Sequence, residues 1–79
     1  MNKALPDGTD LDNIKTNGMY FLRTGANAPL DYFFFIVLQN KTTGDLTQFG
    51  FVMRASINMY IRNYFNDAWT PWKSVNINA

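Results

Sequence analysis

Trp69 and Trp72 are the residues of this sequence whose type and spacing most directly suggest ligand chemistry. They stand three positions apart, and Pro71 between them stiffens the backbone. Flat indole rings suit the C–H faces of saccharides and are enriched at interfaces, so the pair could form a sugar-stacking platform. The same rings could instead close the core at one end of a sheet. Both interpretations stay open, and Trp69, nearer the preceding turn, is the better candidate for contact.

Tyr60, Arg62 and Tyr64 form a second candidate group, because they alternate along the chain. In an extended strand, residues two apart point to the same face, so the three side chains would form one stripe. Arg stacks on aromatic rings and donates in a fork to oxygen acceptors, which suits a carbohydrate or a partner chain. Alternatively, Arg62 is structural and lies over a Tyr or Trp ring at the surface.

The residues on which most enzymes and metal sites depend are missing. The chain has no Cys and no His, which removes disulfides and the commonest general base and metal ligand. Ser56 and Ser74 therefore have no imidazole partner. Asp10, Asp12 and Asn13 lack the third acidic ligand and the Glu of a calcium loop, so helix capping explains them better. The acidic residues all lie in or beside expected turns, and they are Asp7, Asp10, Asp12, Asp31, Asp45 and Asp67. We expect a protein that is not an enzyme, with no catalytic residue, cofactor or metal.

Charge and hydropathy exclude further classes of function. Seven Lys and Arg against six Asp and Glu give a net charge of +1, without the basic surface of a nucleic-acid-binding protein. The longest apolar run, residues 33–38, is far shorter than the roughly 20 residues of a membrane-spanning helix. Residues 1–10 do not have the pattern of a signal peptide. We expect no nucleic-acid partner and no membrane insertion.

The periodicity predicts a mostly β fold: a small antiparallel β-sheet domain of about five strands with one short N-terminal helical turn. Residues 1–9 are expected to be a flexible lead-in, and residues 10–79 a single domain. Asp10 caps the turn, with Leu11 and Ile14 pointing inward. The expected strands are residues 19–23, 32–39, 46–53, 57–64 and 73–77, and alternation favours a strand over a helix for 54–64.

Two details of these strands carry further expectations. Residues 32–39 have almost no polar break, which is typical of a central strand covered on both faces. We expect the helical turn or another protomer over its second face. Gly50, inside the alternating run 46–53, indicates a bulge or the close approach of another group. Residues 54–56 are expected to be a short connection.

A set of short motifs follows in order along residues 10–75. They are D-L-D-N-I at 10–14, G-M-Y-F-L at 18–22, A-N-A-P at 26–29, F-I-V-L at 35–38, T-Q at 47–48, M-Y-I-R at 59–62 and W-T-P-W-K-S-V at 69–75. In this order they resemble the pyocin-knob family, small domains found in phage and pyocin tail fibres. The chain departs from the family pattern after A-N-A-P, where Asp31 and three Phe stand in place of a strand richer in Gly.

The resemblance implies a non-catalytic, knob-like β domain of a virion tail fibre or a prophage-encoded particle. Such a domain serves fibre assembly and attachment to a host cell-surface glycan, such as a teichoic acid, lipopolysaccharide or capsule. Its other partners would be tail-fibre chains, often in a homotrimer. The ligand-contact candidates are Asn27, Tyr60, Arg62, Tyr64 and Trp69. Two alternatives remain: a carbohydrate-binding module of a cell-wall enzyme, and a purely structural trimerisation connector with the same aromatic face buried between protomers.

Overall fold

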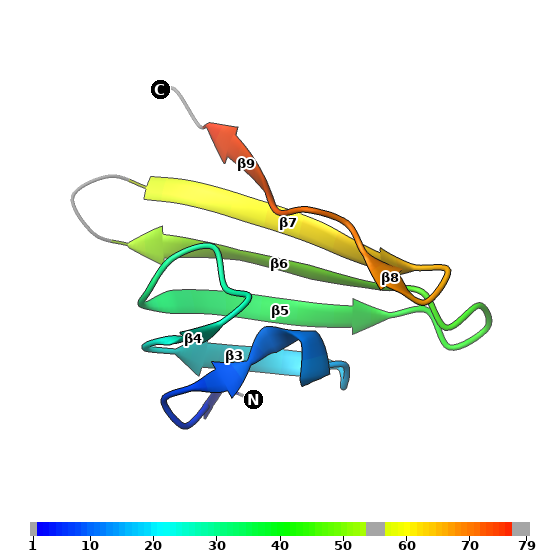
Figure 1. The fold of residues 1–79 in the computed structure, drawn as a ribbon, viewed down its shortest axis with the longest axis horizontal. Helices are drawn as coiled ribbons and strands as arrows, with labels where there is room; N and C mark the ends of the chain where they lie inside the picture. Colours follow the sequence, from blue (N-terminus) through cyan, green and yellow to red (C-terminus); the bar gives the residue numbers. More distant parts are fainter. Residues whose placement is uncertain (1, 54–56, 77–79) are drawn as a thin grey trace.

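The computed structural model describes residues 2–53 and 57–76, and it confirms a small, mostly β domain with one helical turn. The expected connection at 54–56 and the expected strand position Ile77 lie outside the described residues. The main sheet has the order β1-β3-β5-β6-β7, and β8 and β9 both pair with the remaining edge of β7 (Figure 1). Its strands are β1 (Asn2–Ala4), β3 (Gly18–Leu22), β5 (Phe33–Gln39), β6 (Leu46–Met53), β7 (Ile57–Phe65), β8 (Ala68–Trp69) and β9 (Lys73–Asn76). Every pairing in this sheet is antiparallel except β1 with β3.

The N-terminal segment differs from the expected flexible lead-in. Asn2–Ala4 pairs in parallel with β3, and the Leu5 N–H continues the pairing by donating to the Phe21 carbonyl oxygen at 2.8 Å. Further on, β2 (Thr9–Asp10) pairs with β4 (Gly25–Ala26) in a separate two-stranded parallel ladder. These pairings use backbone groups, so the side-chain pattern gave no sign of them.

The helical turn forms where the sequence predicts it. The 3₁₀ helix η1 (Leu11–Asn13) follows Asp10, whose side chain accepts a hydrogen bond from the Asp12 N–H at 2.9 Å. Leu11 is fully buried and Ile14 is half-buried against the core. Capping by Asp10 satisfies an N–H that the helix itself leaves without a partner.

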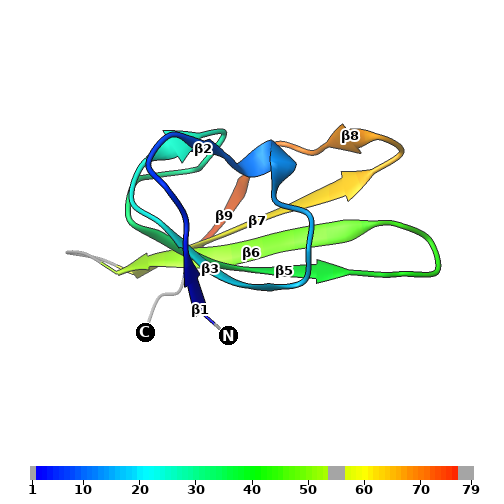
Figure 2. The same cartoon turned by 90° about the horizontal axis from the view of Figure 1, so that it is seen from below.

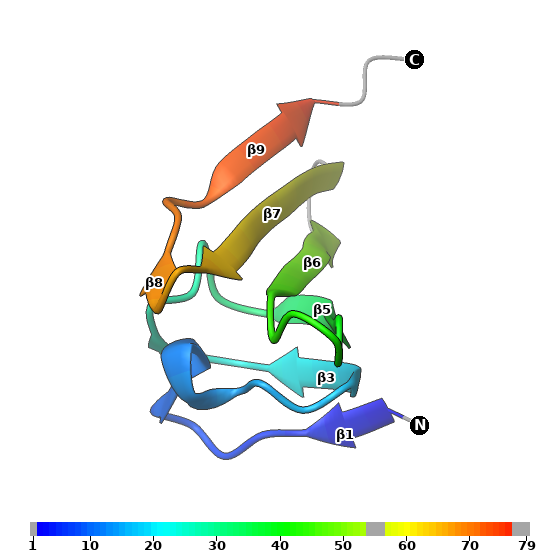
Figure 3. The ribbon, with the colours of Figure 1, turned by 90° about the vertical axis from the view of Figure 1, so that its right-hand side faces the viewer.

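The two faces of the main sheet have different surroundings. Figures 2 and 3 show η1, β2, β4 and β8 on one side of the sheet, which we call the covered face. This face carries the core of Tyr20, Leu22, Phe33, Phe35, Val37, Leu46 and Val52, together with the polar Gln48 and Arg62. No described segment lies over the other side, which we call the open face (Figure 2). By alternation and register, the open face presents the apolar side chains Met19, Phe21, Phe34, Ile36, Leu38, Phe49, Phe51, Met59, Ile61, Phe65 and Val75, together with Thr47, Asn63 and Lys73.

Gly50 lies where two strands approach closely, as its place in an alternating run predicts. It pairs with Phe35 on one side and Tyr60 on the other. A Cβ at this position would overlap the Phe34 carbonyl oxygen and lie 2.6 Å from the Phe35 Cβ. The covered face therefore has no room for a side chain here, and large rings from both neighbouring strands flank the gap.

Residues with left-handed backbone conformation shape two of the connections between strands. Asn66 and Asp67 have φ values of 58° and 61°, the pattern of a type I′ turn, and this turn joins β7 to β8. Tyr32 has φ 59°, so β5 begins one residue later than the sequence indicates, at Phe33. No helix among the residues described here is long and apolar enough to cross a membrane.

Candidate functional site

Arg62, a predicted ligand contact, is an internal clamp on the covered face. Its side chain is 5% exposed, and its guanidinium carbon lies 3.8 Å from the centroid of Trp69 and 4.7 Å from that of Trp72. Its Nε donates to Gln48 Oε1 and its Nη1 donates to Asp12 Oδ1, both at 2.9 Å. Burial lowers the pKa of the guanidinium, and the hydrogen bond to Asp12 opposes that effect. So little exposed surface leaves Arg62 poorly placed for direct contact with a ligand.

Gln48 connects this clamp to the helical turn. It is fully buried, and its Nε2 donates to the carbonyl oxygens of Leu11 at 2.7 Å and Ile14 at 2.9 Å. Its Oε1 accepts from Arg62, so both ends of the amide have partners. A buried amide costs stability unless it is paired, and here the pairing fixes η1 over the middle of the sheet.

Asn27 holds the loop between β4 and β5 against the same cluster. Its left-handed backbone (φ 58°) lets the side-chain Nδ2 donate to Asp10 Oδ1 at 2.8 Å and Asp12 Oδ2 at 3.2 Å. Its carbonyl oxygen accepts from Trp72 Nε1 at 2.8 Å. The hydrogen bond from Asn27 is the main reason that the pKa of Asp10 lies below its usual value, with the Asp12 N–H second. These contacts tie the loop, η1 and the Trp72 segment together.

The remaining predicted contacts continue a row of aromatic rings. Tyr64 packs against Trp69 with centroids 5.0 Å apart, and Lys15 Nζ lies 4.2 Å from the Tyr64 centroid. At the other end, Phe33 forms T-shaped contacts with Trp72 and Tyr60, with ring centroids 5.3 and 6.3 Å apart. The structure thus gathers Asn27, Arg62 and Trp69 in one cluster, with Tyr64 beside it and Tyr60 beyond Phe33. Trp69 and Trp72 pack against the core while staying half-buried, so part of each ring reaches the surface.

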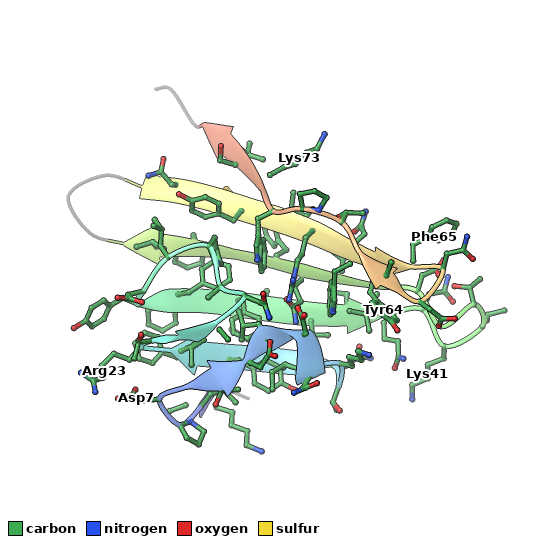
Figure 4. All side chains as sticks on the ribbon, in the orientation of Figure 1. Asp7, Arg23, Lys41, Tyr64, Phe65 and Lys73 are labelled. Atoms are coloured by element: carbon green, nitrogen blue, oxygen red, sulfur yellow. The ribbon has the colours of Figure 1, made fainter. Side chains whose placement is uncertain are left out.

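A groove lies at the end of the sheet where the β5–β6 and β7–β8 turns meet, and we call it the tip groove. It consists of two hollows of about 460 and 480 Å³ that share Asp45, Tyr64 and Phe65. Phe65 is 59% exposed. Figure 4 labels Tyr64 and Phe65 at this end of the sheet, together with Lys41 of the β5–β6 turn. Gln39, Asn40, Thr43, Thr47, Asn63, Asn66 and Asp67 also line the hollows.

Of the predicted contacts, only Tyr64 lines the tip groove. Phe65 and the polar residues around it were missed, because the sequence marks 40–45 and 65–68 only as turns. Their proximity follows from the register of β6 and β7, in which Leu46 is opposite Tyr64. The alternating pattern indicates that these strands exist without fixing the register that sets which side chains lie together.

The tip groove combines an apolar ring with polar side chains. Phe65 offers an exposed apolar ring, and the short carboxylate, amide and hydroxyl side chains around it supply hydrogen-bond donors and acceptors. The hollows have the volume of ordinary small-molecule sites. Within residues 2–53 and 57–76, no group of three His, Cys, Asp or Glu side chains is placed to hold a metal ion.

Comparison with known proteins gave no match: neither a protein-family model, nor a curated protein, nor a solved structure corresponds to this chain. The resemblance to the pyocin-knob family stays a prediction from the ordered motifs.

Proposed function

We propose that this chain is a non-catalytic binding and assembly module that contacts a saccharide polymer through the tip groove. A tail-fibre knob domain that attaches to a host cell-surface glycan is the setting that the ordered motifs favour. The observation that carries the proposal is the lining of the groove, in which the exposed ring of Phe65 lies among side chains able to bind hydroxyl groups.

A saccharide has both apolar and hydrogen-bonding surfaces, and the tip groove has side chains suited to each. Its C–H faces pack on flat aromatic rings, and the exposed ring of Phe65 provides one. Its hydroxyl groups donate and accept hydrogen bonds, which Asp45, Asn63 and Asn66 can return. A site that combines an apolar ring with a few polar groups fixes both the position and the orientation of its ligand.

The β5–β6 turn, which forms one side of the groove, is held in shape by its own hydrogen bonds. The Asn40 N–H donates to the Asp45 carbonyl oxygen at 2.8 Å, and the Gly44 N–H donates to the Asn40 carbonyl oxygen at 2.7 Å. The Thr42 N–H donates to Asn40 Oδ1 at 2.9 Å. A preformed site loses less entropy when the ligand binds, which supports a role in recognition.

The proposal is tested by binding of the chain to an array of bacterial surface polysaccharides that includes lipopolysaccharide, teichoic acid and capsule. We expect Phe65→Ala to weaken binding about tenfold, the equivalent of roughly 1.4 kcal/mol, without unfolding the domain. Leu30→Ala is the matched control, because Leu30 is also exposed (47%) but lies in the loop 27–32, at the other end of the sheet (Figure 1).

The variant Trp69→Ala distinguishes the contribution of the tip groove to binding from that of the aromatic row on the covered face. Trp69 stacks on Arg62 and packs against the core, so we expect its loss to lower stability more than affinity. No binding to any polysaccharide on the array, or an equal loss of affinity in Phe65→Ala and Leu30→Ala, would show that the tip groove is not a saccharide site.

A further inference from the structure

The open face is an apolar surface that the described chain leaves uncovered (Figure 2). One row across the sheet runs Phe21, Phe34, Phe51, Met59 and Val75, each paired with the next in register. Phe21 and Phe34 have ring centroids 4.6 Å apart, and those of Phe34 and Phe51 are 6.0 Å apart. The rings therefore form a continuous cross-strand ladder on the side of the sheet away from the core.

A parallel second row is equally apolar. Met19, Ile36, Phe49 and Ile61 follow one another in register, and Lys73 ends the row at the outer edge of β9. Lys73 is the one charged residue at the described positions of the two rows. A single cation at the rim gives the face little attraction for anionic lipids, which bind clusters of basic residues.

The sequence of β5 indicates that this face has a partner. Its near-continuous apolar run is typical of a strand covered on both faces. On the covered side Phe33, Phe35 and Val37 are buried, whereas on the open side Phe34 and Ile36 stay half-exposed. Within the single domain, β5 is therefore covered on only one of its two faces. Because its own loops already occupy the Tyr60–Arg62–Tyr64 side, the opposite face is the one left for assembly.

The open face has the shape of a surface that can pack against itself. Phe34, Ile36, Phe49 and Phe51 border a dimple of about 90 Å³, roughly the space of one aliphatic side chain. Met19 also lines the dimple, and it is 49% exposed. A two-fold contact joins one surface patch to an identical one, so the patch must be complementary to itself, and here an exposed Met19 side chain lies beside a hollow of side-chain size.

The area of the face is sufficient for such a contact. Met19, Leu38 and Val75 are 49%, 61% and 46% exposed, and the seven other apolar side chains of the two rows are half-buried. At about 200 Å² for a large side chain, these ten present on the order of 650 Å² of apolar surface per copy. Two copies packed face to face would bury about 1,300 Å², at the small end of specific interfaces. We therefore propose that a second copy of this chain covers the open face, with the two sheets packed as in a β-sandwich.

This inference deepens the assembly part of the proposed function and does not depend on saccharide binding at the tip groove. The test is the mass of the 79-residue chain by sedimentation equilibrium from about 5 to 500 µM. We expect the 9.1 kDa monomer to give way to at least twice that mass, with a dissociation constant in the micromolar range. Leu38 of the open face also lines the tip groove, so the two proposals are scored by separate measurements, saccharide binding on the array and self-association by mass.

Met19→Lys is the diagnostic variant, because it places a charge beside the dimple at a position exposed enough to keep the fold. We expect it to raise the dissociation constant at least tenfold, whereas Leu30→Lys, equally exposed but in the loop 27–32, leaves it unchanged. If near-ultraviolet circular dichroism shows that Met19→Lys has not folded, the dissociation constant of Ile36→Thr is measured instead, because Thr keeps a β-branched residue in β5.

Three outcomes would overturn the proposal. The first is a wild-type chain that stays monomeric up to 500 µM. The second is association that Met19→Lys and Leu30→Lys weaken equally. The third is flotation of monomeric chain with phosphatidylcholine vesicles and no self-association, which would assign the face to a lipid surface instead.

Discussion

Replacement of Arg62 by Met tests whether the clamp on the covered face holds the fold together. Met keeps a long, unbranched apolar side chain between Trp69 and Trp72 but removes every donor. Gln48 Oε1 then loses the Nε donor at 2.9 Å, and Asp12 Oδ1 loses Nη1. The variant therefore separates the polar contribution of Arg62 from its bulk.

The expected cost follows from the burial of each partner. Gln48 is fully buried, so its orphaned oxygen costs about 1 to 3 kcal/mol. The guanidinium between two indole rings contributes about 1 to 2 kcal/mol more, of which the Met sulfur restores a part. The side chain of Asp12 is 39% exposed, so water replaces its lost donor and it adds little. The free energy of unfolding should fall by about 2 to 4 kcal/mol, which lowers Tm by roughly 10 to 25 °C.

Urea unfolding at neutral pH measures this loss, with the near-ultraviolet signal of the two Trp as the probe of packing. Arg23→Met is the matched control, because Arg23 forms its ion pair with Asp7 at the surface, where both side chains are largely exposed. We expect a much smaller change there. The double variant Gln48→Leu, Arg62→Met should cost at least 1 kcal/mol less than the sum of the two single variants, because the pair shares one hydrogen bond.

A loss below about 1 kcal/mol in Arg62→Met would refute this reasoning, because the buried Gln48 oxygen would then have found another donor. Strict additivity in the double variant would refute it as well, since independent sites show no coupling.

Three further changes probe the fold around the two sites. Gly50→Ala forces a Cβ against the Phe34 carbonyl oxygen, so we expect the free energy of unfolding, measured in urea, to fall by about 2 to 3 kcal/mol. A variant as stable as the wild type would contradict the close approach of the two strands. Asn27→Gly keeps the left-handed backbone but removes the amide that lowers the pKa of Asp10. The variant should be fully destabilised above pH 3.8, the usual pKa of Asp, and the destabilisation should disappear as pH falls through the lower pKa of Asp10 in the folded protein. A loss of stability that does not depend on pH would argue against the coupling between Asn27 and Asp10. Asp67→Gly relieves a left-handed residue in the β7–β8 turn and should stabilise by about 0.5 kcal/mol, whereas a lower urea midpoint would show that the Asp side chain supports the turn.

The sequence by itself determined five of the strands, the alternation of faces along them and the helical turn. Alternation in 46–53 and 57–64 assigns Phe49 and Ile61 to one side and Gln48 and Arg62 to the other, and the register confirms both. Asp10 caps η1 as predicted, and Gly50 marks a close approach. These features are local, because side-chain period, capping and the absence of a Cβ act within a few residues or one strand neighbour.

Only the tertiary structure decided which strand ends meet, which face is covered and what Arg62 does. The stripe of Tyr60, Arg62 and Tyr64 suits a surface or an interior equally well, and the covering loops make it an interior. The tip groove exists because the register brings Asp45 and Phe65 together across β6 and β7. Such contacts join residues distant along the chain, and they depend on register and on where the loops fold back, which no local pattern specifies.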